Sequence, residues 1–189
     1  MRRTFARSGL GLTVALALAG TTPASTEPLE PSGAKTVQEY DVKTPEGEVH
    51  HVKVWKRLDG PRRVPSEIVK QHQALAGAGC QGFTMGATRS DVFGNVLLSY
   101  SQRIDWCYDG TNVTWVTHSK TPAVYGTYIR FNGIIADNHS GGAGTPFFKA
   151  YSQADFCQFI PWGGCTWYVY PWVDQYVFGS GGTSGAAGS

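Results

Sequence analysis

The chain has 189 residues, of which 41% are hydrophobic, 13% aromatic and only 16% charged, with 24 Gly, 10 Pro and 4 Cys. This composition excludes a disordered chain, which has few apolar residues and many charges, and the abundance of Gly excludes a coiled coil. Sixteen Lys and Arg against 14 Asp and Glu give a net charge of +2, far from the strongly basic character of nucleic-acid-binding proteins.

The first 24 residues have the layout of a secretory signal peptide. Three arginines precede an apolar run from Leu10 to Ala19, and Ala17-Leu18-Ala19 is a candidate cleavage site. The run is about half of the roughly 20 apolar residues that span a membrane, so we expect export rather than anchoring. Arg2-Arg3 leaves the Sec and twin-arginine routes both open. Removal of residues 1–24 leaves 13 basic and 14 acidic residues. We expect a secreted monomer that binds neither nucleic acid nor membrane.

Four cysteines form an even set in a chain with an export signal, which is typical of two disulfides. They are Cys80, Cys107, Cys157 and Cys165. Three pairings are possible, and we expect Cys80–Cys107 and Cys157–Cys165 because each closes a short local loop. A zinc site is the alternative, but the sequence has no C-x-x-C pair and no nearby Cys/His grouping. No metal or cofactor is therefore expected.

Residues 25–79 form a charged N-terminal region. Short segments at 37–42 and 49–55 predict a hairpin, and Ser66–Ala76 predicts the only helix, with Ser66 as its cap. The region is either an N-terminal subdomain or a removable pro-segment.

Residues 80–178 have the alternating pattern of β-strands. Six apolar residues between Val96 and Tyr108 share one face, and Arg103 and Asp105 share the other with two serines. Asp109-Gly110 predicts a two-residue type I′ turn, which would pair Trp106 with Val113 and Ile104 with Trp115. The fold predicted from this pattern is mainly β.

The rest of the β region contains a second predicted turn at Asn132-Gly133, followed by strands at 145–157 and 165–178. Pro171 inside the last strand indicates an edge, a bulge or a break, since proline cannot donate to a ladder. Several short strands predict an antiparallel β-sandwich or a partly closed barrel with one short helix in the N-terminal part. Residues 179–189, GSGGTSGAAGS, predict a flexible tail.

The sequence contains none of the common catalytic or cofactor motifs: nucleophile elbow, phosphate loop, dinucleotide fingerprint or H-E-x-x-H. Two carboxylates suffice for a glycosidase, and Asp105 and Asp174 are candidates, but their spacing does not select them as a pair. We therefore assign no catalytic residue.

An aromatic row near the C-terminus is the most suggestive feature of the sequence. Tyr168, Tyr170, Trp172 and Tyr176 alternate onto one face of a strand, and Trp162 lies in the Cys157–Cys165 loop. Such rings fill cores, but exposed rings of this kind combine a flat apolar face with a polar edge and stack on sugar rings. The opposite face of the same strand is equally apolar. If one of these two faces lies in the core, the other must be covered by another element or exposed to solvent.

The stretch from Gln102 to Gly110 contains Ile104, Asp105, Trp106-Cys107-Tyr108 and Asp109-Gly110. It resembles a W-C-[YW]-D-G hairpin motif of small secreted proteins of actinobacterial type. The resemblance covers the β half of the chain and implies an extracellular location and a β-rich domain. It implies no activity and no site residues.

Three functional hypotheses follow from these features. The first is a secreted, non-enzymatic β-sandwich that binds cell-wall or environmental polysaccharide through exposed aromatic residues. The second is a small secreted hydrolase that uses a carboxylate pair. The third is an interaction protein, such as an inhibitor or a toxin, with a secreted protein as its partner.

Overall fold

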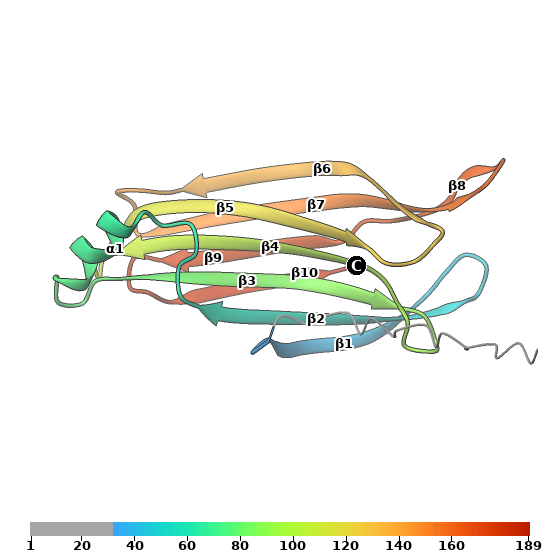
Figure 1. Cartoon of the computed structure of the whole chain (residues 1–189), viewed down its shortest axis with the longest axis horizontal. Coiled ribbons are helices and arrows are strands. Elements are labelled where there is room, and N and C mark those ends of the chain that lie inside the picture. Colours follow the sequence, from blue (N-terminus) through green and yellow to red (C-terminus); the bar gives the residue numbers. More distant parts are fainter. Residues whose placement is uncertain (1–31) are drawn as a thin grey trace, which may run out of the picture.

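The structure, a computed structural model, describes residues 32–189 as two antiparallel sheets that face each other (Figure 1). The first sheet has the order β1-β2-β3-β4-β5, and the second has the order β10-β9-β7-β6 with β8 paired to β7. The first sheet contains β1 (Lys35–Lys43), β2 (Val49–Asp59), β3 (Gly79–Ser90), β4 (Val96–Tyr108) and β5 (Val113–Val124). The second contains β6 (Ile129–Gly141), β7 (Phe147–Ile160), β8 (Gly164–Val169), β9 (Trp172–Phe178) and β10 (Thr183–Gly188). The predicted β-sandwich is confirmed, while the predicted signal peptide, residues 1–24, lies outside the described residues.

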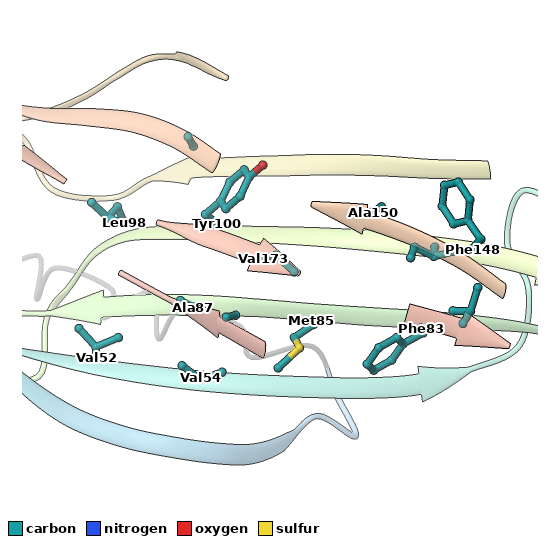
Figure 2. Close-up of a cluster of buried hydrophobic side chains, with 14 of the residues drawn as sticks. Val52, Val54, Phe83, Met85, Ala87, Leu98, Tyr100, Phe148, Ala150 and Val173 are labelled. Atoms are coloured by element: carbon teal, nitrogen blue, oxygen red, sulfur yellow. The ribbon is translucent and has the colours of Figure 1, made fainter. Parts of the chain in front are cut away.

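The core lies between the two sheets, where apolar side chains from both inner faces meet. Figure 2 shows Val52 and Val54 of β2 and Met85 of β3 in one cluster with Phe148 of β7 and Val173 of β9. Because side chains alternate along a strand, each strand gives every second residue to this layer. The burial of this apolar surface is the main force that holds the sheets together.

The alternation predicted for β4 is confirmed. Leu98, Tyr100, Ile104 and Trp106 all point into the core and are at most 1% exposed. The indole Nε1 of Trp106 donates to the carbonyl of Phe178 at 3.3 Å, so its one polar group has a partner across the sandwich.

The N-terminal region is part of the first sheet. The predicted hairpin is present as β1 and β2, and β2 then pairs with β3 from His51↔Ser90 to Asp59↔Gly82. A boundary at residue 79 would fall at the start of β3, inside the sheet. The described part of this region therefore supplies two of the five strands of the first sheet.

The predicted helix is shorter than expected. Helix α1 runs over Ser66–Gln73, and Pro65 stands at the N-cap position without a side-chain cap. Ser66 is the first helical residue, and its hydroxyl donates to Glu67 Oε1 at 2.9 Å. The prediction of Ser66 as the cap is wrong because Pro65 already ends the extended backbone before the helix.

The turn after β4 is wider than the predicted two-residue turn. Asp109 Oδ1 accepts hydrogen bonds from the backbone N–H groups two and three residues ahead, at 2.9 and 2.7 Å, which stabilises a longer loop. With a bulge next to this loop, Trp106 pairs with Val116 and not with Val113. The predicted register is wrong: Val116 lies opposite Trp106, where Val113 was predicted, and His118 lies opposite Ile104, where Trp115 was predicted.

The predicted turn at Asn132-Gly133 is a β-bulge. Strand β6 runs straight through both residues and stays paired with β7. Phe131 pairs with Phe156 and Gly133 with Asp155, so Asn132 is the extra residue. Gly133 has a φ of +150°, which explains why glycine stands there. The same Asn-Gly signal fits a turn or a bulge, and pairing with β7 selects the bulge.

The C-terminal segment is not a flexible tail. β10 pairs with β9 from Thr183↔Val177 to Gly188↔Trp172, and Ala187 is buried in the core. Beyond the strand, the backbone N–H of Ser189 donates to the hydroxyl of Tyr40 at 3.0 Å. The composition suggested a linker, but small side chains also allow the close approach of backbones that this edge needs.

Both expected disulfides are present, so the alternative of a zinc site on these thiols is excluded. Cys80–Cys107 joins directly facing residues of β3 and β4. Cys157–Cys165 closes the β7–β8 hairpin, which projects beyond the end of the sandwich (Figure 1).

Candidate functional site

The aromatic row lies on the outer face of the second sheet. Along β8 and β9 the odd-numbered Val169, Val173 and Val177 are buried in the core, at most 3% exposed. The even-numbered positions face outward, and the row consists of Tyr168, Tyr170, Trp172 and Tyr176, each half-exposed or partly buried. The interpretation of this row as core is therefore wrong. We call this surface, with the facing side chains of β7, the aromatic face.

Pro171 interrupts the ladder in the middle of the row without changing which side chains face outward. Both β8 and β9 pair with β7, and the carbonyl of Pro171 still accepts the N–H of Ala154 at 2.9 Å. The predicted break at Pro171 is thus confirmed. The predicted edge position is wrong, because β10 covers the other side of β9.

Tyr168 and Tyr170 form the most exposed part of the row. Their rings are nearly parallel, with centroids 6.2 Å apart and an angle of 6° between the planes. They are 46% and 45% exposed, which leaves large apolar ring surface in contact with water. Two parallel rings, one on β8 and one in the break before β9, offer a flat platform for a flat ligand.

Trp172 and Tyr176 stand above a floor of small side chains. On β10, Gly188 lies opposite Trp172 and Ser184 lies opposite Tyr176. A Cβ atom at Gly188 would come within 3.0 Å of the indole Nε1, so the indole lies over this glycine. The rings are thus supported from below and form a ridge.

Polar groups accompany the rings on the aromatic face. Lys149 forms an ion pair with Asp174 at 3.2 Å, and its Nζ lies 4.9 Å from the centroid of the Tyr176 ring. Hydrogen bonds with Tyr176 and Asp174 raise the pKa of Lys149. The second oxygen of Asp174, Oδ1, is buried and has no hydrogen-bond partner among residues 32–189.

The face continues from β9 across β7 to β6. Tyr151 lies opposite Asp174, and Asn138 of β6 lies opposite Tyr151. Tyr151 and Asn138, together with Lys149, line a shallow depression of about 350 Å³. The aromatic face therefore combines rings, an ion pair and amide groups beside a hollow, the mixture of apolar surface and few polar groups that is typical of ligand sites.

Trp162 is separate from this row. It lies in the turn of the β7–β8 hairpin, where its side chain is fully exposed and its φ is +74°. The Cys157–Cys165 disulfide stabilises the hairpin that carries it. The structure thus brings four of the five predicted aromatic residues into one row and leaves Trp162 at the tip.

The two candidate carboxylates of a hydrolase are on opposite sides of the molecule. Asp105 lies on the outer face of the first sheet, is 1% exposed and accepts hydrogen bonds from Arg103. Asp174 lies on the outer face of the second sheet. A glycosidase needs its carboxyl groups about 5–10 Å apart at one cleft, so these two candidates do not form a catalytic pair.

Sequence reasoning missed Lys149 and Tyr151, which lie beside Tyr176 and Asp174. Residues 147–153 alternate strictly, with large or polar residues outward and Ala150 and Ser152 buried. The signal that would have found them is the short Cys157–Cys165 loop. It forces a hairpin and so fixes which residues of the two strands face each other.

No protein family, curated protein or solved structure matches the chain. In the part of the chain that the structure describes, no helix is both long and apolar enough to cross a membrane. By its own features the chain is a two-disulfide antiparallel β-sandwich with an aromatic outer face.

Proposed function

We propose that this protein is a secreted, non-catalytic β-sandwich that binds polysaccharide through its aromatic face. The observation that carries the proposal is the outward-facing row of Tyr168, Tyr170, Trp172 and Tyr176 along β8, β9 and the break between them. A soluble monomeric protein rarely exposes a contiguous row of aromatic side chains unless the row binds a partner, because contact between apolar ring surface and water is unfavourable.

The chemistry of the face suits a sugar chain. Sugar rings have an apolar C–H surface and a rim of hydroxyl groups, so they match flat rings with polar groups at the side. Here the Lys149–Asp174 ion pair lies beside the rings, with Lys149 opposite Tyr176 and Asp174 opposite Tyr151. A row along a strand favours an extended polymer over a compact small molecule.

The proposed location is extracellular. Both disulfides support it, since disulfides persist in oxidising compartments and are rare in the cytosol. The signal-peptide layout of residues 1–24 and the near-neutral charge of the remaining chain are further support.

A glycan array followed by pull-down on insoluble cell-wall polysaccharides tests the proposal. We expect wild-type protein to bind at least one polysaccharide, and Tyr170→Ala to weaken this binding at least tenfold. The matched control is Tyr128→Ala, which removes an equally exposed tyrosine, 56% exposed, from the β5–β6 connection. Binding of a protein and of no glycan would favour the interaction-protein hypothesis instead.

A further inference from the structure

A cavity of about 420 Å³ opens at the end of the sandwich that lies opposite α1. The β3–β4 loop, the β5–β6 connection and β8 surround it together with the start of β2. Its walls are mainly apolar and include Leu97, Ile129 and Trp167, with His50 as a polar group. None of the four residues of the aromatic row lines it, so it is a separate site.

A buried cation lies directly behind this wall. The guanidinium carbon of Arg89 is 4.4 Å from the centre of the Trp167 ring, and its Nε donates to His50 Nδ1 at 2.9 Å. Arg89 is only 2% exposed, and burial lowers its pKa to about 10, so it stays charged at neutral pH. Within residues 32–189 its Nη2 is buried without a hydrogen-bond partner and no carboxylate pairs with it. A buried charge without a counter-ion is costly, which indicates that an anion completes this site.

His50 connects Arg89 to the cavity, because it accepts a hydrogen bond from Arg89 and also lines the cavity wall. Because Nδ1 accepts the hydrogen bond from Arg89, the proton of the neutral ring is on Nε2. Burial and the charge of Arg89 lower the pKa of His50, against the opposing effect of Glu48, so the ring is neutral at pH 7. The nearest carboxylate oxygen, Glu48 Oε2, is 3.6 Å from Nε2, beyond normal hydrogen-bond range. Nε2–H is therefore a donor available to a ligand in the cavity.

The mouth of the cavity is apolar and exposed. Phe93 of the β3–β4 loop is 86% exposed, Tyr128 of the β5–β6 connection 56% and Val92 52%, and all three line the cavity. Large apolar side chains at loop tips leave a patch that a ligand can cover. The cavity thus has a cation behind its inner wall and apolar side chains at its mouth.

We propose that this cavity binds a small organic acid with an apolar body, its carboxylate on His50 Nε2 and its body against Trp167 and Phe93. The two acidic residues of the lining, Glu48 and Asp91, repel an anion at His50, but two features limit their effect. Both oxygens of Asp91 already accept hydrogen bonds, from the N–H groups of Phe93 and Asn95 and from the Asn95 side chain. The carboxylate of Glu48 is 64% exposed, so water and salt screen its charge. The inference does not depend on polysaccharide binding.

Calorimetric titration of the full-length protein with decanoate, and with decan-1-ol as the neutral analogue of equal length, tests the proposal. We expect decanoate to bind at least tenfold more tightly than the alcohol, because only the acid gains the charge-assisted hydrogen bond. In Arg89→Met we expect this preference to disappear. Equal affinity for the two ligands in wild-type protein, or no binding of either, would overturn the proposal.

Two further variants keep the test decisive if Arg89→Met does not fold. Phe93→Ala removes an exposed ring at the mouth and should weaken both ligands by a similar factor. Tyr170→Ala changes the aromatic face and should leave decanoate binding unaltered while it weakens polysaccharide binding, which separates the two sites. Unchanged decanoate affinity in Phe93→Ala would contradict the placement of the ligand in this cavity.

Discussion

Gln102 of β4 and Gln175 of β9 join the two sheets through the core. Gln102 Nε2 donates to Gln175 Oε1 and to the carbonyl of Ala150, both at 3.0 Å, and Gln175 Nε2 donates to the carbonyl of Phe83 at 3.3 Å. Both glutamines are fully buried. A hydrogen bond between two buried amides, one from each sheet, fixes how one sheet sits on the other.

Replacement of either glutamine by leucine should destabilise the sandwich. We expect Gln102→Leu and Gln175→Leu each to cost about 1–3 kcal/mol, because each leaves a buried amide or carbonyl without its partner. The double variant should cost less than the sum of the two, by about 1 kcal/mol, since the orphaned groups disappear together. Urea unfolding of the four proteins measures this coupling, and strictly additive losses would contradict it.

Gly82 lies directly beneath the guanidinium of Arg103. A Cβ atom at residue 82 would come within 1.9 Å of Arg103 Nη2, whose side chain is held by Asp105 at 2.8 Å and by Asp59 at 2.7 Å. Since Arg103 cannot move without breaking these ion pairs, Gly82→Ala should cost about 3 kcal/mol. Gly60→Ala is the matched control, because nothing lies within 4 Å of its Cβ position. Similar melting temperatures for both variants would contradict this prediction, because they would show that the Arg103 guanidinium moves aside without loss of stability.

Acidification should destabilise the protein below about pH 6.5. Burial lowers the pKa of both His50 and His118, with Arg89 and Lys120 respectively acting in the same direction. The unfolded chain, with ordinary histidine pKa values near 6.5, then binds more protons than the folded chain, so stability rises with pH through this window. The free energy of unfolding measured between pH 5 and 7 should fall toward acid.

The variant His50→Gln/His118→Gln provides the control for this pH dependence. Its free energy of unfolding should vary less steeply between pH 5.5 and 6.5, whatever its absolute stability. A slope equal to that of the wild-type protein would assign the effect to other groups.

Removal of the disulfides should have unequal effects. Cys80–Cys107 spans 27 residues and Cys157–Cys165 spans 8. Loop-closure entropy predicts losses of about 3.5 and about 2.5 kcal/mol for the respective double alanine variants. Denaturant unfolding measures both, and a larger loss for the shorter loop would mean that the β7–β8 hairpin contributes more than its loop entropy.

Local alternation was enough to predict much of the fold. The faces of β4 and the shared face of the aromatic row follow from a two-residue period, and the pairing of the cysteines follows from short loops, but the period did not show whether the row faces the core or the solvent. Errors arose where one local signal fits two structures. Asn132-Gly133 fits a turn or a bulge, and residues 179–189 fit a linker or a strand of small residues. In both cases the neighbouring strand decides, and the sequence does not show which strand that is.

The candidate sites were predictable to different degrees. The row from Tyr168 to Tyr176 is contiguous in sequence, so its periodicity reveals it. Lys149 requires knowledge of the β7–β9 register. The end cavity brings His50, Arg89 and Trp167 together from β2, β3 and β8, and no local pattern connects three strands that far apart.

The proposed binding role of the aromatic face is tested most directly by the affinity of one variant for polysaccharide. Affinity electrophoresis in gels that contain the best polysaccharide from the array gives dissociation constants for wild-type protein, Tyr170→Ala and Tyr128→Ala. We predict a rise of at least tenfold in the dissociation constant for Tyr170→Ala and no change for Tyr128→Ala. Equal migration of all three proteins through every gel would contradict a binding function for this face.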